Sequence, residues 1–204
     1  MRDYFCQNLG VTMKHIMIDL ETMGIKATAP IVAIGAAVFN PETGEIGKTF
    51  YQRVDLESAV EQGAIIEANT VKWWLRRNAA ARSEITVEDN SHIDIAIHNL
   101  SCFFISQGNE PIVWANGASF DFTILRAAIA RSSSSNLHFW NYWNEQDVRT
   151  ILSSAEWLGI NPNDHITFDG VKHHAMYDAI HQAKCVSYVW QKITRQFDNK
   201  GVLA

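Results

Sequence analysis

The stretch His15-Ile16-Met17-Ile18-Asp19-Leu20-Glu21-Thr22 is an apolar segment of strand type that ends in two carboxylates. Side chains two residues apart on a strand point to the same face, so Asp19 and Glu21 are expected to converge on one spot. Two convergent carboxylates repel each other unless a cation or a proton lies between them. Hard divalent cations such as Mg²⁺ bind oxygen ligands of this kind. Two acids where a strand runs into a loop can equally be ordinary polar residues, so the rest of the chain has to decide.

Length and composition indicate one globular domain. The chain has 204 residues, of which 47% are hydrophobic and 19% charged, which is typical of a compact α/β domain with a substantial core. The formal net charge of −5 argues against a broad basic surface that grips long nucleic acid. The three cysteines are widely spaced and form no C-x-x-C motif, which predicts reduced thiols in a cytoplasmic protein.

The start of the chain carries little structural signal. Residues 1–14 contain no apolar core or cleavage pattern of a signal peptide, and no apolar stretch approaches the roughly 20 residues needed to cross a bilayer. Met13 and Lys14 directly precede the first strand-like segment. We therefore expect residues 1–14 to be a short, dispensable extension and residues 15–204 to form the domain, without a membrane partner.

Hydrophobic patterning predicts strands first and helices afterwards. The predicted strands are Ile16–Leu20, Ile31–Phe39, Thr49–Val54 and Pro111–Ala115, with a hairpin-type turn at Pro41–Glu45. The predicted helices are Val71–Arg82 with Asn69-Thr70 as its cap, Ile93–Ile105, Phe120–Arg131 with Ser119 as its cap, Asp147 to about Leu158, and Ala175–Thr194. This order describes a single α/β domain in which a mixed sheet is flanked by helices on both faces.

Two further segments carry acids at positions that suit chemistry. Asn116-Gly117-Ala118-Ser119-Phe120-Asp121 follows the fourth strand and places Asp121 in the first turn of a helix. His173-His174-Ala175-Met176-Tyr177-Asp178 opens the final helix. Each acid taken alone can be explained by the helix dipole, which favours a carboxylate in a first turn, and His173 can be a solvated loop residue.

Together, the three segments resemble the three motifs of the DEDDh group of 3′–5′ exonucleases, which share a ribonuclease H-like fold. The resemblance extends over nearly the whole chain after Met13 and is greatest to small bacterial and prophage 3′–5′ exonucleases. Asp19-Leu20-Glu21-Thr22 matches the first motif, Asp121 the second, and His173 with Asp178 the third. The resemblance implies phosphodiester hydrolysis from a 3′ end that releases nucleoside monophosphates.

The resemblance also implies the roles of the motif residues. Asp19, Glu21, Asp121 and Asp178 would hold two divalent cations, Mg²⁺ or Mn²⁺, which can activate water and stabilise the leaving oxygen. His173 would act as the general base, a role that suits the near-neutral pKa of histidine.

Two alternatives concern the histidines. His174 is adjacent to His173, and the family spacing of four residues between histidine and aspartate selects His173. His174, Asp178 and His181 fall at i, i+4 and i+7 and could in principle hold Zn²⁺, but that arrangement leaves the acids of the first two motifs unexplained.

Substrate contacts are predicted around the acids. In related enzymes the turn after the first motif approaches the terminal nucleotide, and aromatic side chains stack on bases. Trp73 and Trp74 diverge by about 100° on a helix, so at most one should face the site. The candidate substrate residues are Thr22, Met23, Gly24, Trp74 with Trp73 as its alternative, Asn116 and Phe120. Arg149 is a candidate either for phosphate binding or for a structural ion pair.

The predicted partner is single-stranded or short nucleic acid, DNA or RNA, with a free 3′ end. Family resemblance also favours a homodimer, to which Trp140 and Trp143 could contribute. A second hypothesis, of a different class, is a catalytically silent binding or interaction module with the same fold. The intact acidic set argues against it, because such a module needs no metal ligands.

Overall fold

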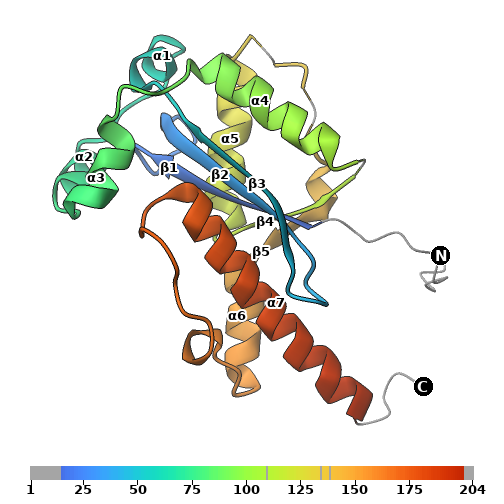
Figure 1. The fold of residues 1–204 in the computed structure, drawn as a ribbon. Coiled ribbons are helices and arrows are strands. Elements are labelled where there is room, and N and C mark those ends of the chain that lie inside the picture. The colour runs from blue at the N-terminus through green and yellow to red at the C-terminus, as the bar shows by residue number, and fades with distance from the viewer. Residues whose placement is uncertain (1–14, 109, 134, 138, 200–204) are drawn as a thin grey trace.

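The computed structural model describes residues 15–108, 110–133, 135–137 and 139–199 (Figure 1). The extension predicted at residues 1–14 lies outside these residues. Within the described chain, no helix is both long enough and apolar enough to cross a membrane.

The centre of the fold is a five-stranded mixed sheet in the order β3-β2-β1-β4-β5. The strands are β1 (His15–Thr22), β2 (Ile31–Phe39), β3 (Ile46–Arg53), β4 (Ile112–Ala115) and β5 (Glu145–Asp147). The first three pair antiparallel, whereas β4 pairs parallel to both β1 and β5. The predicted mixed sheet is therefore confirmed. The edge strand β5 was not predicted, because its sequence Glu-Gln-Asp has no apolar alternation.

Helices lie on both faces of the sheet (Figure 1). They are α1 (Leu56–Glu61), α2 (Ala68–Leu75), α3 (Ala79–Thr86), α4 (Ile93–Ser106), α5 (Ala118–Arg131), α6 (Val148–Trp157) and α7 (Ala175–Asn199). Short 3₁₀ turns occupy Tyr142–Asn144 and Pro162–Asp164. The predicted cap of α6 is confirmed, because the Asp147 side chain accepts a hydrogen bond from the Thr150 amide.

One predicted helix is two separate helices, and one predicted N-cap is wrong. The single helix predicted at Val71–Arg82 is divided into α2 and α3, because the side-chain oxygen of Asn78 accepts the Ala81 amide at 2.8 Å and starts a new helix. The residue at the N-cap of α5 is Gly117 and not Ser119. Gly117 has a φ of 105°, which glycine adopts readily, and the Asp147 carboxylate from the neighbouring strand accepts the Ala118 amide.

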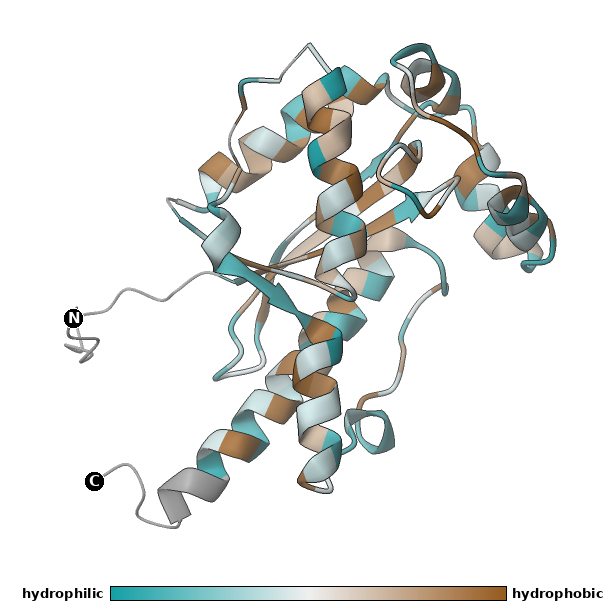
Figure 2. Ribbon diagram, turned by 180° about the vertical axis from the view of Figure 1, so that it is seen from behind, coloured by the Kyte–Doolittle hydropathy of each residue, from teal (hydrophilic) through white to brown (hydrophobic). Residues whose placement is uncertain are grey.

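The alternation along β1 assigns its side chains to two separate cores. Ile16, Ile18 and Leu20 pack with residues of α4 and α5, whereas Met17 packs with residues of α6 and α7. In Figure 2 the central strands are largely hydrophobic, whereas the edge strand β5 is hydrophilic and the helices alternate between the two. Asp19 and Glu21 share the parity of Met17, so the pleat directs both carboxylates to the face that α7 covers.

The start of α7 lies against β2 at unusually short range, and Gly35 makes this approach possible. Gly35 pairs with Asp19 across the sheet. A Cβ atom at position 35 would lie 2.1 Å from the carbonyl carbon of Ala175 and 2.3 Å from the Met176 amide nitrogen. The absence of a side chain at Gly35 therefore brings the first turn of α7 next to Asp19.

Candidate active site

Three carboxylates converge where β1 meets the first turn of α7. The acidic oxygens of Asp19, Glu21 and Asp178 all lie within 4.8 Å of one another. Asp19 and Glu21 reach this point through the strand alternation, and Asp178 through the close approach of α7 to Gly35. A cluster of three acidic side chains with no basic partner among them is a suitable oxygen ligand set for hard divalent cations.

The fourth predicted ligand, Asp121, lies beside this cluster on α5. Its carboxylate Oδ1 accepts a hydrogen bond of 3.1 Å from the backbone amide of Leu20, between the two acids of β1. Asp121 is 3% exposed, and its charge acts on both Asp19 and Glu21. Asp121, in the first turn of α5, thus completes a site of four acids, to which β1, α5 and α7 each contribute.

The four carboxylates strongly resist ionisation together. Burial, followed by the charges of Asp121, Glu21 and Asp178, raises the pKa of Asp19 well above its ordinary value. Burial and the charges of Asp178 and Asp121 raise the pKa of Glu21 to about 8. Burial also raises the pKa of Asp121 to about 7 and, less strongly, that of Asp178. Positive charge at this point would relieve the repulsion, so the electrostatics fit a cation site.

Gln182, one turn beyond Asp178 on α7, supports Asp19. Its side-chain amide donates a hydrogen bond of 2.8 Å to Asp19 Oδ1, and Gln182 is 9% exposed. Sequence reasoning missed this residue. Its position one helical turn after the third motif is a signal that could have indicated it.

The two adjacent histidines have different surroundings. The ring of His173 lies edge-on to Trp73, with ring centroids 4.8 Å apart, beside the cavity described next. His174 is 7% exposed and stacks on Tyr51 at 4.1 Å, with its Nε2 atom 3.6 Å from a carboxylate oxygen of Glu84. The His174 ring is therefore held by Tyr51 and Glu84, whereas the His173 ring lies against Trp73 of the cavity wall.

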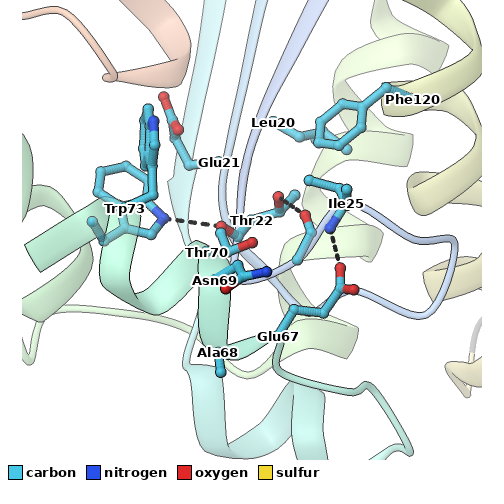
Figure 3. Close-up of a pocket in the computed structure, with 12 residues that line it drawn as sticks. Leu20, Glu21, Thr22, Ile25, Glu67, Ala68, Asn69, Thr70, Trp73 and Phe120 are labelled. Atoms are coloured by element: carbon cyan, nitrogen blue, oxygen red, sulfur yellow. Dashed lines mark hydrogen bonds between the residues drawn. The ribbon is translucent and has the colours of Figure 1, made fainter.

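A cavity of about 640 Å³ opens beside Glu21. In Figure 3, Trp73 and Glu21 lie on one side of it, and Phe120 and Ile25 on the other. The remaining lining residues are Leu20, Thr22, Gly24, Glu67, Ala68, Asn69, Thr70 and Trp74. An apolar slot of this size, ending in carboxylates, suits a flat ring that carries a polar sugar.

Most predicted substrate residues lie at the cavity. Thr22, Gly24, Trp74 and Phe120 line it. Both tryptophans do so, but Trp74 is 3% exposed and donates its indole N–H to the Thr22 carbonyl, whereas Trp73 is 38% exposed. The expectation that at most one of the two would face the site is therefore not met, and Trp73, not the predicted Trp74, is the more exposed ring at the cavity.

Two predicted substrate residues, Met23 and Asn116, are not among the residues that line the cavity. Met23 packs in a small core with Val32, Trp74 and Ala81, beneath the turn after β1. Asn116 accepts a hydrogen bond of 3.3 Å from Arg149 Nε. The Arg149 guanidinium lies over Gly117, and its charge acts on Asp121, so this arginine stands at the rim of the acidic site.

Sequence reasoning also missed part of the cavity wall. Asn69 and Thr70, expected to cap a helix, lie in the first turn of α2 and line the cavity. Glu67, just before α2, accepts hydrogen bonds from the backbone amides of Ile25 and Lys26 and holds the turn after β1 in place. These contacts join residues more than 40 positions apart, which no local pattern reveals.

The mixed sheet and its acid cluster define the chain as a ribonuclease H-like nuclease of the DEDDh group. Residues 14–190 match the family model described as the Rv2179c-like 3′–5′ exoribonuclease domain, and the chain belongs to this family. It is therefore a 3′–5′ exonuclease, as the three sequence motifs predicted.

One curated relative and two solved structures of the same fold are similar to this chain. The exodeoxyribonuclease of Enterobacteria phage T4 is 28% identical over 210 residues, which cover 86% of this chain and 88% of the phage protein. The nuclease domain of 3′hExo, a DEDDh family member bound to rAMP, is 13% identical with a TM-score of 0.54, covering 90% of this chain and 94% of that domain. Exonuclease I of E. coli in complex with a 5cy-dT13 oligonucleotide is 15% identical with a TM-score of 0.62, and the match covers 92% of this chain and 43% of that protein.

Proposed function

We propose that the four carboxylates Asp19, Glu21, Asp121 and Asp178 hold two divalent cations, Mg²⁺ or Mn²⁺, and that His173 is the general base of the exonuclease. The observation that carries this proposal is the convergence of three carboxylates within 4.8 Å, with the buried Asp121 beside them and a cavity at their edge. The donors are all carboxylate oxygens, and burial, followed by the charges of the neighbouring acids, raises the pKa values of Asp19 and Glu21. Both properties fit hard cations.

Each group of residues has a separate role in the proposed reaction. The cavity between Trp73 and Phe120 holds the terminal nucleoside, with its base against aromatic rings. With the nucleoside in this cavity, the scissile phosphate lies next to the four carboxylates. When bound, the cations would lower the pKa of a water molecule and stabilise charge on the phosphate oxygens. His173 takes the proton from that water, and the product is a nucleoside 5′-monophosphate.

Burial lowers the pKa of the His173 ring, and the nearby charges of Arg77 and Lys172 lower it further, while Asp178 acts in the opposite direction. At neutral pH the ring is therefore unprotonated and able to accept a proton.

The substrate we propose is single-stranded or short nucleic acid with a free 3′ hydroxyl. The family description names RNA and the phage relative is named for DNA. Matched DNA and RNA oligonucleotides, digested in parallel with Mg²⁺ or Mn²⁺, measure activity and sugar preference in one experiment. Blocking the 3′ hydroxyl should slow the reaction, whereas blocking the 5′ end should not.

Replacing Asp19 by alanine tests the metal site directly. Removal of one group built to stabilise charge in a transition state costs about 10²–10³-fold in rate, so Asp19→Ala should degrade an oligonucleotide at below about a hundredth of the wild-type rate while remaining folded. Equal rates for the variant and the wild type would refute the assignment.

Two further proposals concern the whole chain. Deleting residues 1–14 should leave the exonuclease activity unchanged, and a loss of activity would show that the segment belongs to the working enzyme. A homodimer is proposed from family resemblance, and sedimentation of the purified chain tests it.

A further inference from the structure

Glu84, on α3, accepts hydrogen bonds from two side chains of β3 and lies beside His174, the residue just before α7. Its Oε2 atom accepts the Tyr51 hydroxyl at 2.8 Å and the Arg53 guanidinium at 2.7 and 3.2 Å, both from β3. The Nε2 atom of His174 lies 3.6 Å away. The Glu84 side chain is 15% exposed, so these contacts are made largely out of water. Such an arrangement is more than a solvated surface ion pair.

His174 connects this cluster to the catalytic groups. Its ring is held between Tyr51 and Tyr177, at centroid distances of 4.1 and 4.5 Å. Its backbone amide donates a hydrogen bond of 3.1 Å to Asp178 Oδ2. The residue whose ring is held in this way therefore also supplies, from its backbone, a hydrogen bond to one of the acids.

His173, immediately before it, has a φ of 65°. This left-handed conformation is unfavourable for a residue with a side chain and persists only where the surroundings enforce it. The next residue, His174, is the one whose side chain contacts Glu84. The strained backbone and the anchored ring thus belong to one turn.

We propose that Glu84 is a positioning residue of the reaction: by fixing the His174 ring, it fixes the turn that presents His173 and Asp178 to the substrate. The inference rests on the roles proposed for those two residues. The contact between Glu84 and His174 joins α3 to the start of α7, which lies beside it (Figure 1). Glu84 touches no reacting atom and acts through His174.

The test compares kcat and KM on a single-stranded oligonucleotide at saturating Mn²⁺. Glu84→Gln and His174→Ala should each lower kcat about tenfold, because misplacement of catalytic groups by a fraction of an ångström costs rates of this order. KM should stay within about twofold, since the cavity is retained. The double variant should be no slower than the slower single variant, because both changes break one connection. His174→Gln, which keeps an N–H group able to reach Glu84, should recover most of the rate.

Glu88→Gln is the matched control, since Glu88 is an exposed acid four residues further along, and its kcat should equal that of the wild type. A Glu84→Gln enzyme with wild-type kcat would overturn the proposal. Single effects that multiply to about a hundredfold in the double variant would also overturn it. A raised KM with unchanged kcat would overturn it too, because that pattern indicates a cavity wall only.

Two measurements keep the test decisive. If Glu84→Gln does not fold, Tyr51→Phe replaces it, because this variant keeps the stacked ring and removes only the hydroxyl; about a threefold lower kcat is expected, and an unchanged kcat contradicts the proposal. His173→Ala is measured in the same assay. Wild-type activity of that variant would refute the proposed function itself, independently of the result at Glu84.

Discussion

At the scale of single residues, Glu21 shows the cost of building a cation site from carboxylates. The side chain is 8% exposed, and its pKa of about 8 in the folded protein compares with an ordinary value of 4.5. A carboxyl group whose pKa is raised by folding favours the folded state in its protonated form, and this contribution is complete at pH values below its ordinary pKa. This contribution is lost as the pH rises through the folded-state pKa.

The pH dependence of stability in the metal-free protein follows from this sign. Between about pH 4.5 and pH 8, the free energy of unfolding of the wild type should fall relative to that of Glu21→Gln, which cannot ionise. At the upper end the variant should be more stable by on the order of 1–3 kcal/mol. Urea unfolding in the presence of EDTA, at a series of pH values, measures the difference. A difference that does not change with pH would contradict the shifted pKa.

The two tryptophans of α2 should behave differently despite being adjacent. Trp73 is 38% exposed at the cavity, and base stacking on an aromatic ring is worth about 1–3 kcal/mol, so Trp73→Ala should raise KM about tenfold with little change in stability. Trp74→Ala should instead destabilise the fold by about 3–5 kcal/mol, because Trp74 is buried. Paired kinetic and thermal-unfolding measurements separate the two, and a reversal of the two patterns would refute the assignment.

At the scale of elements, the site depends on how closely α7 approaches β2. The helix begins directly over Gly35, the partner of Asp19 across the sheet. This contact sets the distance between Asp19 and Asp178, and with it the geometry of the acid cluster.

Gly35→Ala should therefore impair both stability and catalysis. The added Cβ would lie 2.1 Å from the Ala175 carbonyl carbon, and forced overpacking costs about 1–3 kcal/mol. Because the displaced helix carries Asp178, kcat should fall more than about tenfold. Gly47→Ala in β3 is the matched control, since its Cβ would lie 3.5 Å from the nearest atom and should change neither property. Full activity of Gly35→Ala would show that the helix position is not critical.

At the scale of the whole molecule, the acidic site joins three elements that are far apart in the sequence. Asp19 and Glu21 belong to β1, Asp121 to α5 and Asp178 to α7. A ligand that binds carboxylates from all three elements binds only the folded chain, so it must stabilise that chain as a whole.

Divalent cations should therefore raise the unfolding temperature. At a Mn²⁺ concentration of 100 times the Kd, the stabilisation should be about 2.7 kcal/mol, measured as a thermal shift against an EDTA-treated sample. Asp19→Ala should show little of this shift, whereas Asp89→Asn, a change at an exposed acid, should retain it. An equal shift in both variants would indicate nonspecific cation binding.

The sequence by itself determined the mixed sheet and the family, together with the candidate acids. These features follow from short-range rules: strand alternation directs Asp19 and Glu21 to one face, and the family spacing places His173 and Asp178 around the start of one helix. The family spacing also selected His173 over His174, and the tertiary structure added what holds the ring of His174, namely Tyr51 and Glu84.

The tertiary structure also decided the wall of the cavity, where Glu67 and Trp73 meet the turn after β1, and the closeness of α7 to Gly35. The physical reason is the range of the interactions. The periodicity of a strand or helix can be recognised from residues close together in the sequence. These contacts instead join side chains and backbone more than 40 positions apart, and only the folded chain brings them together.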